Sequence, residues 1–200
     1  MKKIIYTLSI VLGLSLSANA QIESLAGPRL GIAIISPGMT SHFINGEVDL
    51  DEIADDWSTD PDITDNASAA FLTLYGWQWE SRFADGGDVT GIVEWVALVG
   101  GMEKGLFLPS VSSLVGARTS SGLEFAAGPN LSLSGVAMVL GAGYNFKSGD
   151  LNMPVNIAFV PNMKKKYTEG HYNDGEETET KWSHNTGARF SITVGFNMGR

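Results

Sequence analysis

The 200-residue sequence contains no cysteine. It therefore has no disulfide framework, no thiolate metal site and no residue for the lipid anchor of a lipoprotein. Basic residues are also scarce, with 13 lysines and arginines against 22 aspartates and glutamates. Because nucleic-acid-binding proteins carry basic surfaces, nucleic acid is not expected as a partner.

Long hydrophobic runs are missing as well, since no stretch after the first twenty residues approaches the ~20 apolar residues of a membrane-spanning helix. The N-terminus has Lys2 and Lys3, an apolar run over 4–16, and then Ala18-Asn19-Ala20. This order is typical of a signal peptide. We expect cleavage before Gln21, which leaves 11 basic and 22 acidic residues in one mature domain.

The remaining sequence favours β structure. From Gly27 onward, segments of about ten residues alternate between apolar and polar positions, and turn-rich sequences separate them. We expect Gly128-Pro129-Asn130 to end the fifth strand, while residues 131–133 could join either neighbour. The predicted strands lie near 28–36, 67–83, 88–101, 106–118, 123–128, 134–146, 151–161 and 186–198.

The connections between these segments differ in length in a regular way. Short turns at 85–87, 120–122 and 147–150 occupy even-numbered positions, whereas the long segments 37–66 and 162–185 are the first and seventh connections. All long segments then lie at the same end of the predicted strands. This pattern predicts an all-β fold, a closed antiparallel transmembrane β-barrel of about eight strands, with extracellular loops 37–66 and 162–185.

The distribution of large apolar residues indicates which face meets lipid. In the last strand the apolar residues share one face, and the other face is small or polar. A soluble β-sandwich also alternates, but the signal peptide and the aromatic cluster Tyr75, Trp77, Trp79 and Phe83, near a predicted turn, favour a bacterial outer membrane containing lipopolysaccharide. The apolar face of the last strand comprises Phe190, Ile192, Val194, Phe196 and Met198.

The strand and loop pattern of residues 21–200 resembles small outer-membrane barrels of the OmpA/OmpX-like type. The stretch from Gly128-Pro129-Asn130 to Phe159-Val160-Pro161 is similar to uncharacterised barrels of Bacteroidota-type bacteria. The pattern Asn185-x-Gly187-x-x-Phe190-x-Ile192 resembles the β-signal of such proteins, which implies the barrel insertion machinery as a partner.

Charged residues inside the predicted strands share the polar face, which should line the lumen. An eight-stranded barrel is only wide enough for side chains to fill, so these charges should pair as a plug of salt bridges. The alternative is a gated channel or proton path. The lumen set comprises Arg29, Glu80, Arg82, Glu94, Arg118, Glu124 and Arg189. Arg118 and Glu124 flank a three-residue turn and should form an ion pair.

The segment 37–66 carries nine acidic residues and no lysine or arginine. Hard cations such as Ca²⁺ or Mg²⁺ prefer carboxylates, so a site that bridges to lipopolysaccharide phosphates is one hypothesis and a simply solvated loop is the other. The same stretch predicts a short helix over 49–57. The candidate ligands are Asp49, Asp51, Glu52, Asp55 and Asp56. No cofactor is expected.

The segment 162–185 is predicted to form a hairpin rather than disordered chain. Asp174-Gly175 favours a two-residue turn, and the resulting register places Tyr167 opposite Trp182. We expect this arm to continue the seventh and eighth strands and to contact an extracellular partner. The candidate contact residues are Tyr167, His171, Tyr172 and Trp182.

The function expected from these features is a non-enzymatic structural or surface-interaction role. One alternative is a lipid hydrolase resembling lipid A deacylases, which would need Ser183, His184 and a carboxylate to converge. Adjacent strand residues point to opposite faces, which argues against that dyad. The other alternative is a narrow channel.

Overall fold

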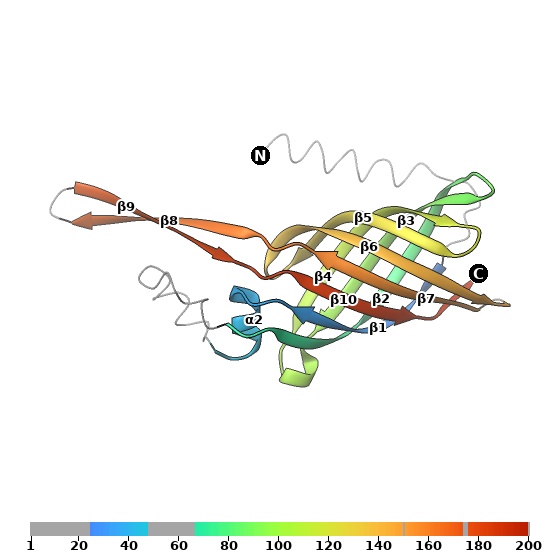
Figure 1. Cartoon of the computed structure of the whole chain (residues 1–200), viewed down its shortest axis with the longest axis horizontal. Helices are drawn as coiled ribbons and strands as arrows, with labels where there is room; N and C mark the ends of the chain where they lie inside the picture. Colours follow the sequence, from blue (N-terminus) through green and yellow to red (C-terminus); the bar gives the residue numbers. More distant parts are fainter. Residues whose placement is uncertain (1–24, 48–66, 150, 174–175, 200) are drawn as a thin grey trace.

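The computed structural model describes residues 25–47, 67–149, 151–173 and 176–199 (Figure 1). Among these residues, no helix is long and apolar enough to cross a membrane. In chain order the elements are β1 (Leu25–Ile35), α2 (Met39–Ile44), β2 (Ala70–Asp85), β3 (Val89–Gly100), η1 (Met102–Lys104), β4 (Leu108–Thr119), β5 (Leu123–Ser132), β6 (Gly135–Ser148), β7 (Leu151–Val160), β8 (Lys164–Asn173), β9 (Glu176–Asn185), β10 (Arg189–Gly195) and β11 (Asn197–Gly199).

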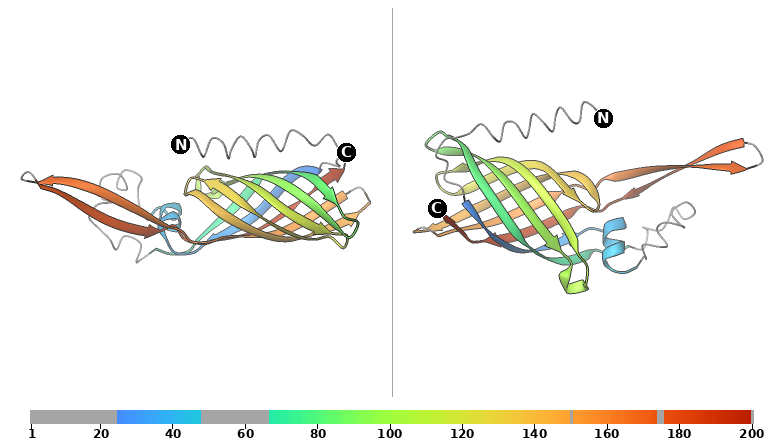
Figure 2. Two further views of the ribbon diagram at one scale, coloured as in Figure 1. Left: turned by 90° about the horizontal axis from the view of Figure 1, so that it is seen from above. Right: turned by 180° about the vertical axis from the view of Figure 1, so that it is seen from behind.

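The strands close into a barrel in which every neighbour is antiparallel (Figure 2). Strand β1 pairs with β2 on one side and with β10 and β11 on the other. Strands β10 and β11 form a single eighth strand interrupted at Phe196, because both pair with β7 in one register. The expected closed eight-stranded antiparallel barrel is therefore confirmed.

The two ends of the barrel differ. The turn end carries the short connections β2–β3, β4–β5 and β6–β7. The helix end carries α2, η1, the β5–β6 turn and the β8–β9 hairpin (Figures 1 and 2). Leu25 pairs with Gly199, so the first and last described strands start and finish together at the turn end, as an even strand number requires.

The β8–β9 hairpin extends the barrel wall without a change of register. Arg189 faces Val160 in the barrel, and Tyr167 faces Trp182 in the arm. The two residue numbers have the same sum in both pairs, so the register is the same. The base is held by hydrogen bonds from the Thr186 N–H to the Met163 carbonyl and from the Gly187 N–H to the Asn162 side chain. The predicted hairpin and its register are confirmed, while residues 174–175 lie outside the described residues.

Helix α2 crosses the helix end of the barrel. It follows β1, and the hydroxyl of Thr40 contacts that of Ser134 at 3.2 Å, in the β5–β6 turn. Because β1 and β5 lie on opposite sides of the eight-strand ring, this contact spans the mouth. Helix α2 was not predicted because Gly38, at its start, has no side chain that signals a helix N-terminus. The Ser41 hydroxyl instead accepts a hydrogen bond from the Gly38 N–H. The helix predicted over 49–57 lies outside the described residues.

The predicted end of the fifth strand is wrong. Strand β5 continues through Gly128-Pro129-Asn130 to Ser132. Its pairing with β4 is interrupted opposite Ser113 and Leu114 and then resumes in the same register. Proline has no N–H to donate, and the interruption lets β5 absorb it without bending away.

The outer face of every barrel strand carries exposed large hydrophobic side chains. In β6 these are Val136, Met138 and Leu140, which alternate with the buried Ala137 and Val139. The aromatic residues of β2 are also exposed, but only Phe83 lies beside the β2–β3 turn. Tyr75, Trp77 and Trp79 are spaced along the strand, so they form a lengthwise stripe rather than the cluster expected near that turn.

The register of the hairpin can be tested by cross-linking in this cysteine-free chain. We expect a Tyr167→Cys, Trp182→Cys variant to form a disulfide on oxidation, because these backbone positions face each other. A Tyr167→Cys, Lys181→Cys variant is the control, since residue 181 is one step out of register and alternation puts its Cβ on the other face. Mass spectrometry of non-reducing digests reads out both, and equal cross-linking of the two variants would contradict the register.

Candidate functional site

Inward-facing side chains divide the lumen into two halves. Toward the helix end most of them are apolar, with a buried cluster of Ala33, Ile35, Ile44, Ala70, Leu72 and Leu74. Toward the turn end they are charged or amide side chains. The expectation of a uniformly small or polar interior is therefore wrong for the apolar half.

Arg118 is the centre of the charged half. Its terminal nitrogens donate to both carboxylate oxygens of Glu80, at 2.6 and 2.5 Å, and its Nε donates to Glu124. Such a fork-shaped contact fixes both direction and plane of the guanidinium. Glu124 faces Arg118 directly on the neighbouring strand, whereas Glu80 is two strands away, on β2. The predicted Arg118–Glu124 ion pair is confirmed.

Arg29 forms a second hydrogen-bonded group through neutral side chains. Its Nε donates to Gln78 at 2.9 Å and one terminal nitrogen donates to Asn197 at 2.8 Å. The Gln78 amide nitrogen in turn donates to Glu94 at 2.5 Å. Gln78 thus accepts from the cation and donates to the anion, so it connects two charged groups through one amide.

A glycine makes room for Arg29. Gly195 faces Arg29 across the β1–β10 pair, and a Cβ at this position would lie 1.9 Å from a guanidinium nitrogen. Any side chain at this position would displace the guanidinium from the space that it fills. This close approach explains why the inward-facing position 195 of the last strand is a glycine.

Together, these hydrogen-bonded side chains fill the cross-section of the barrel. Arg29 and Glu80 are each 1% exposed and Gln78 is 2% exposed. The linked residues come from β1, β2, β3, β4, β5 and β11, and an Asn145–Asn152 hydrogen bond joins the two remaining strands, β6 and β7, at 3.1 Å. We call these two neighbouring hydrogen-bonded groups, which comprise Arg29, Gln78, Glu80, Glu94, Arg118, Glu124 and Asn197, the charged layer.

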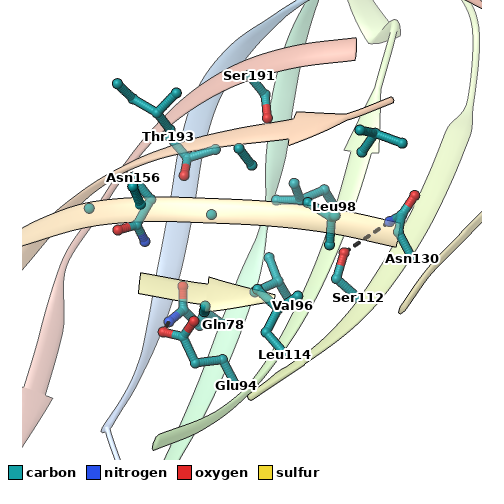
Figure 3. A pocket seen from close by; sticks show the side chains of 18 of the residues that line it. Gln78, Glu94, Val96, Leu98, Ser112, Leu114, Asn130, Asn156, Ser191 and Thr193 are labelled. Atoms are coloured by element: carbon teal, nitrogen blue, oxygen red, sulfur yellow. Dashed lines mark hydrogen bonds between the residues drawn. The ribbon is translucent and has the colours of Figure 1, made fainter. Parts of the chain in front are cut away.

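Cavities lie on both sides of this layer. Next to it, toward the helix end, is a cavity of about 80 Å³ that Gln78, Glu94, Val96 and Leu114 line (Figure 3). Beyond it is a larger cavity of about 480 Å³ beneath α2, which we call the vestibule. A third cavity of about 450 Å³ opens at the turn end beside Arg82.

Comparisons with known proteins give no relatives. No family model matches the chain, and no curated protein or solved structure matches it significantly.

The structure brings together five of the seven predicted lumen residues: Arg29, Glu80, Glu94, Arg118 and Glu124. Arg82 lines the cavity at the turn end instead. Arg189 lies apart in the other half, where it donates to Asn130 at 2.7 Å. Sequence reasoning missed Gln78 and Asn197, although their inward parity was a usable signal.

The other predicted site residues are not brought together in a site within the described structure. The candidate metal ligands Asp49, Asp51, Glu52, Asp55 and Asp56 lie outside the described residues. Within the described part, no three His, Asp or Glu side chains are grouped to hold a metal ion. Tyr167, His171, Tyr172 and Trp182 are placed on the hairpin by its backbone. Ser183 is exposed and His184 is buried, as expected for neighbours on opposite faces.

Removing the central cation tests the charged layer. We expect Arg118→Leu to lower the free energy of unfolding by roughly 3–5 kcal/mol, because Glu80 and Glu124 would remain buried without their partner. Reversible urea unfolding measures this. Lys147→Leu is the control, since it removes an exposed positive charge at the same end and should change stability by less than about 0.5 kcal/mol. Similar losses in both variants would contradict a special role for Arg118.

Proposed function

We propose that this chain is a non-enzymatic barrel of the bacterial outer membrane that acts through its helix end. The observation that carries the proposal is the apolar outer face, which continues around all eight strands. Soluble monomers rarely expose contiguous apolar patches above a few hundred Å². A bilayer is the solvent that such a face suits, and a closed barrel leaves no unpaired strand edge in lipid.

The proposed orientation follows from the two ends. Outer-membrane barrels have short periplasmic turns and longer extracellular segments. The turn end would therefore face the periplasm, and α2 and the hairpin would face outward. Because the arm continues the wall in register and projects well beyond the barrel (Figure 1), it offers the largest surface for an extracellular partner.

The two alternatives receive less support. A lipid hydrolase would need a serine and a histidine within reach of each other, but Ser183 and His184 point to opposite faces. A channel would need a continuous path, but the charged layer occupies the cross-section with side chains that are almost completely buried. A structural or surface-interaction role requires neither feature.

Surface labelling tests location and orientation together. We expect a Thr178→Cys variant, in β9, to react with a membrane-impermeant maleimide on intact cells that express the full chain. Ser148→Cys, at the end of β6, should react only after the cells are broken. The chain should also sediment with outer membranes. Labelling at residue 148 alone on intact cells, or recovery in the soluble fraction, would contradict the proposal.

A conductance measurement tests the closed lumen. We expect the purified barrel to show no stepwise ion conductance in planar bilayers, because the charged layer leaves no open path. A variant with Arg29→Ala, Gln78→Ala and Arg118→Ala removes the three side chains that span the layer, and it should conduct if it folds. A native protein that conducts in steady steps would favour the channel instead.

A further inference from the structure

We propose that the vestibule binds a free medium-chain carboxylic acid, with the carboxylate on Arg189 and the alkyl chain against the apolar walls beneath α2. The proposal goes beyond the surface role above. It also does not depend on it, because the cavity and its cation are properties of the barrel itself.

Arg189 supplies the reason for an anionic group. It lines the vestibule, the 80 Å³ cavity and a small recess, so it lies where all three meet. Its one hydrogen bond within the described structure goes to the neutral side chain of Asn130, and no carboxylate pairs with it there. A partly buried guanidinium without a counterion favours an anion that can accept from its free N–H groups.

The walls supply the reason for an alkyl chain. The vestibule has a volume of about 480 Å³, within the range of roughly 300–1,000 Å³ that is typical of small-ligand sites. Its lining is mainly aliphatic and aromatic, with Leu72, Leu74 and Leu108 from the strands and Met39 and Phe43 from α2. An unbranched apolar chain would replace water against these side chains.

The recess beside Arg189 favours a carboxylate as the head group. It measures only about 30 Å³, close to the space of one water molecule. Hydroxyl and amide groups of Thr40, Asn130, Ser132 and Thr186 form part of its lining, and apolar side chains such as Ile35 and Val160 form the rest. One carboxylate oxygen can enter this recess while the second stays in the vestibule, and two oxygens in one plane match the fork of the guanidinium.

Among the described residues that line the vestibule, Arg189 alone carries a charge at neutral pH. His184 contributes to the lining, and its burial lowers its pKa, so the imidazole is neutral. The charge on the described lining side chains is therefore positive and comes from a single group. That places the head group at the inner end and the chain toward α2.

Methyl NMR of methionine is the most direct test, using the full barrel in nanodiscs and decanoate as the probe. The Met39 methyl group lines the vestibule, whereas Met138 points outward from β6 and reports partitioning into the bilayer. We expect decanoate to shift the Met39 signal saturably. Decanol, which has the same chain without a charge, should bind roughly ten- to hundred-fold more weakly.

Variants separate the head group from the chain. Arg189→Gln should reduce decanoate affinity to that of decanol, and Arg189→Lys should retain part of the preference for the acid. Ser110→Phe, which adds bulk where the vestibule meets the inner cavity, should weaken both probes. Lys147→Gln removes a charge at the turn end and should change neither.

Two results would overturn the proposal. One is equal affinity for decanoate and decanol in the native barrel, which decides the role of Arg189 even if its variants do not fold. The other is a Met39 signal that moves only in proportion to Met138, which would show partitioning into the bilayer and no site. Neither result would affect the labelling pattern on which the proposed location rests.

Discussion

The fork between Arg118 and Glu80 is the interaction on which the interior of this barrel depends. An eight-stranded barrel has room inside for side chains and little else, so a charge that points inward must be neutralised by another side chain. Glu80 and Glu94 face each other directly on β2 and β3, an arrangement that is unfavourable by itself. Arg118 neutralises the first, and the amide of Gln78 donates to the second.

This pairing of inward charges explains why the charged and apolar halves of the lumen lie at different positions along the barrel axis. Charges that pair must lie at the same level, and the charged layer gathers them toward the turn end. The remaining inward positions can then be apolar, and Leu72 and Leu74 pack beneath α2. Arg189 is the exception, since it lies among apolar groups with one amide partner. Arg189 therefore carries the ligand hypothesis, and the cations inside the layer hold strands together.

Sequence alternation was sufficient to predict the barrel, the inward face of each strand, the Arg118–Glu124 pair and the hairpin register, because each depends on parity or on one short turn. It was not sufficient to predict the level of a residue along the axis. Arg189 shares the parity of Gly195, which faces Arg29, but at about 3.4 Å per residue it lies roughly 20 Å farther along the strand. Gln78 and Asn197 were missed for a different reason. Their amides bind charged side chains of other strands, and these come together only when the strands close into a ring.

The helix end joins the proposed contact surface to the proposed ligand site through backbone hydrogen bonds. The Thr40 N–H donates to the carbonyl of Thr186 at 3.3 Å, and the Ser36 N–H donates to that of Ala188 at 2.8 Å. These carbonyls belong to the short segment between the arm and Arg189. The arm, α2 above the vestibule and β10 with its cation are therefore joined through one short segment of backbone. Because energetic coupling requires such contiguous packed and hydrogen-bonded elements, this segment is the place where the proposed ligand site and the proposed contact surface meet.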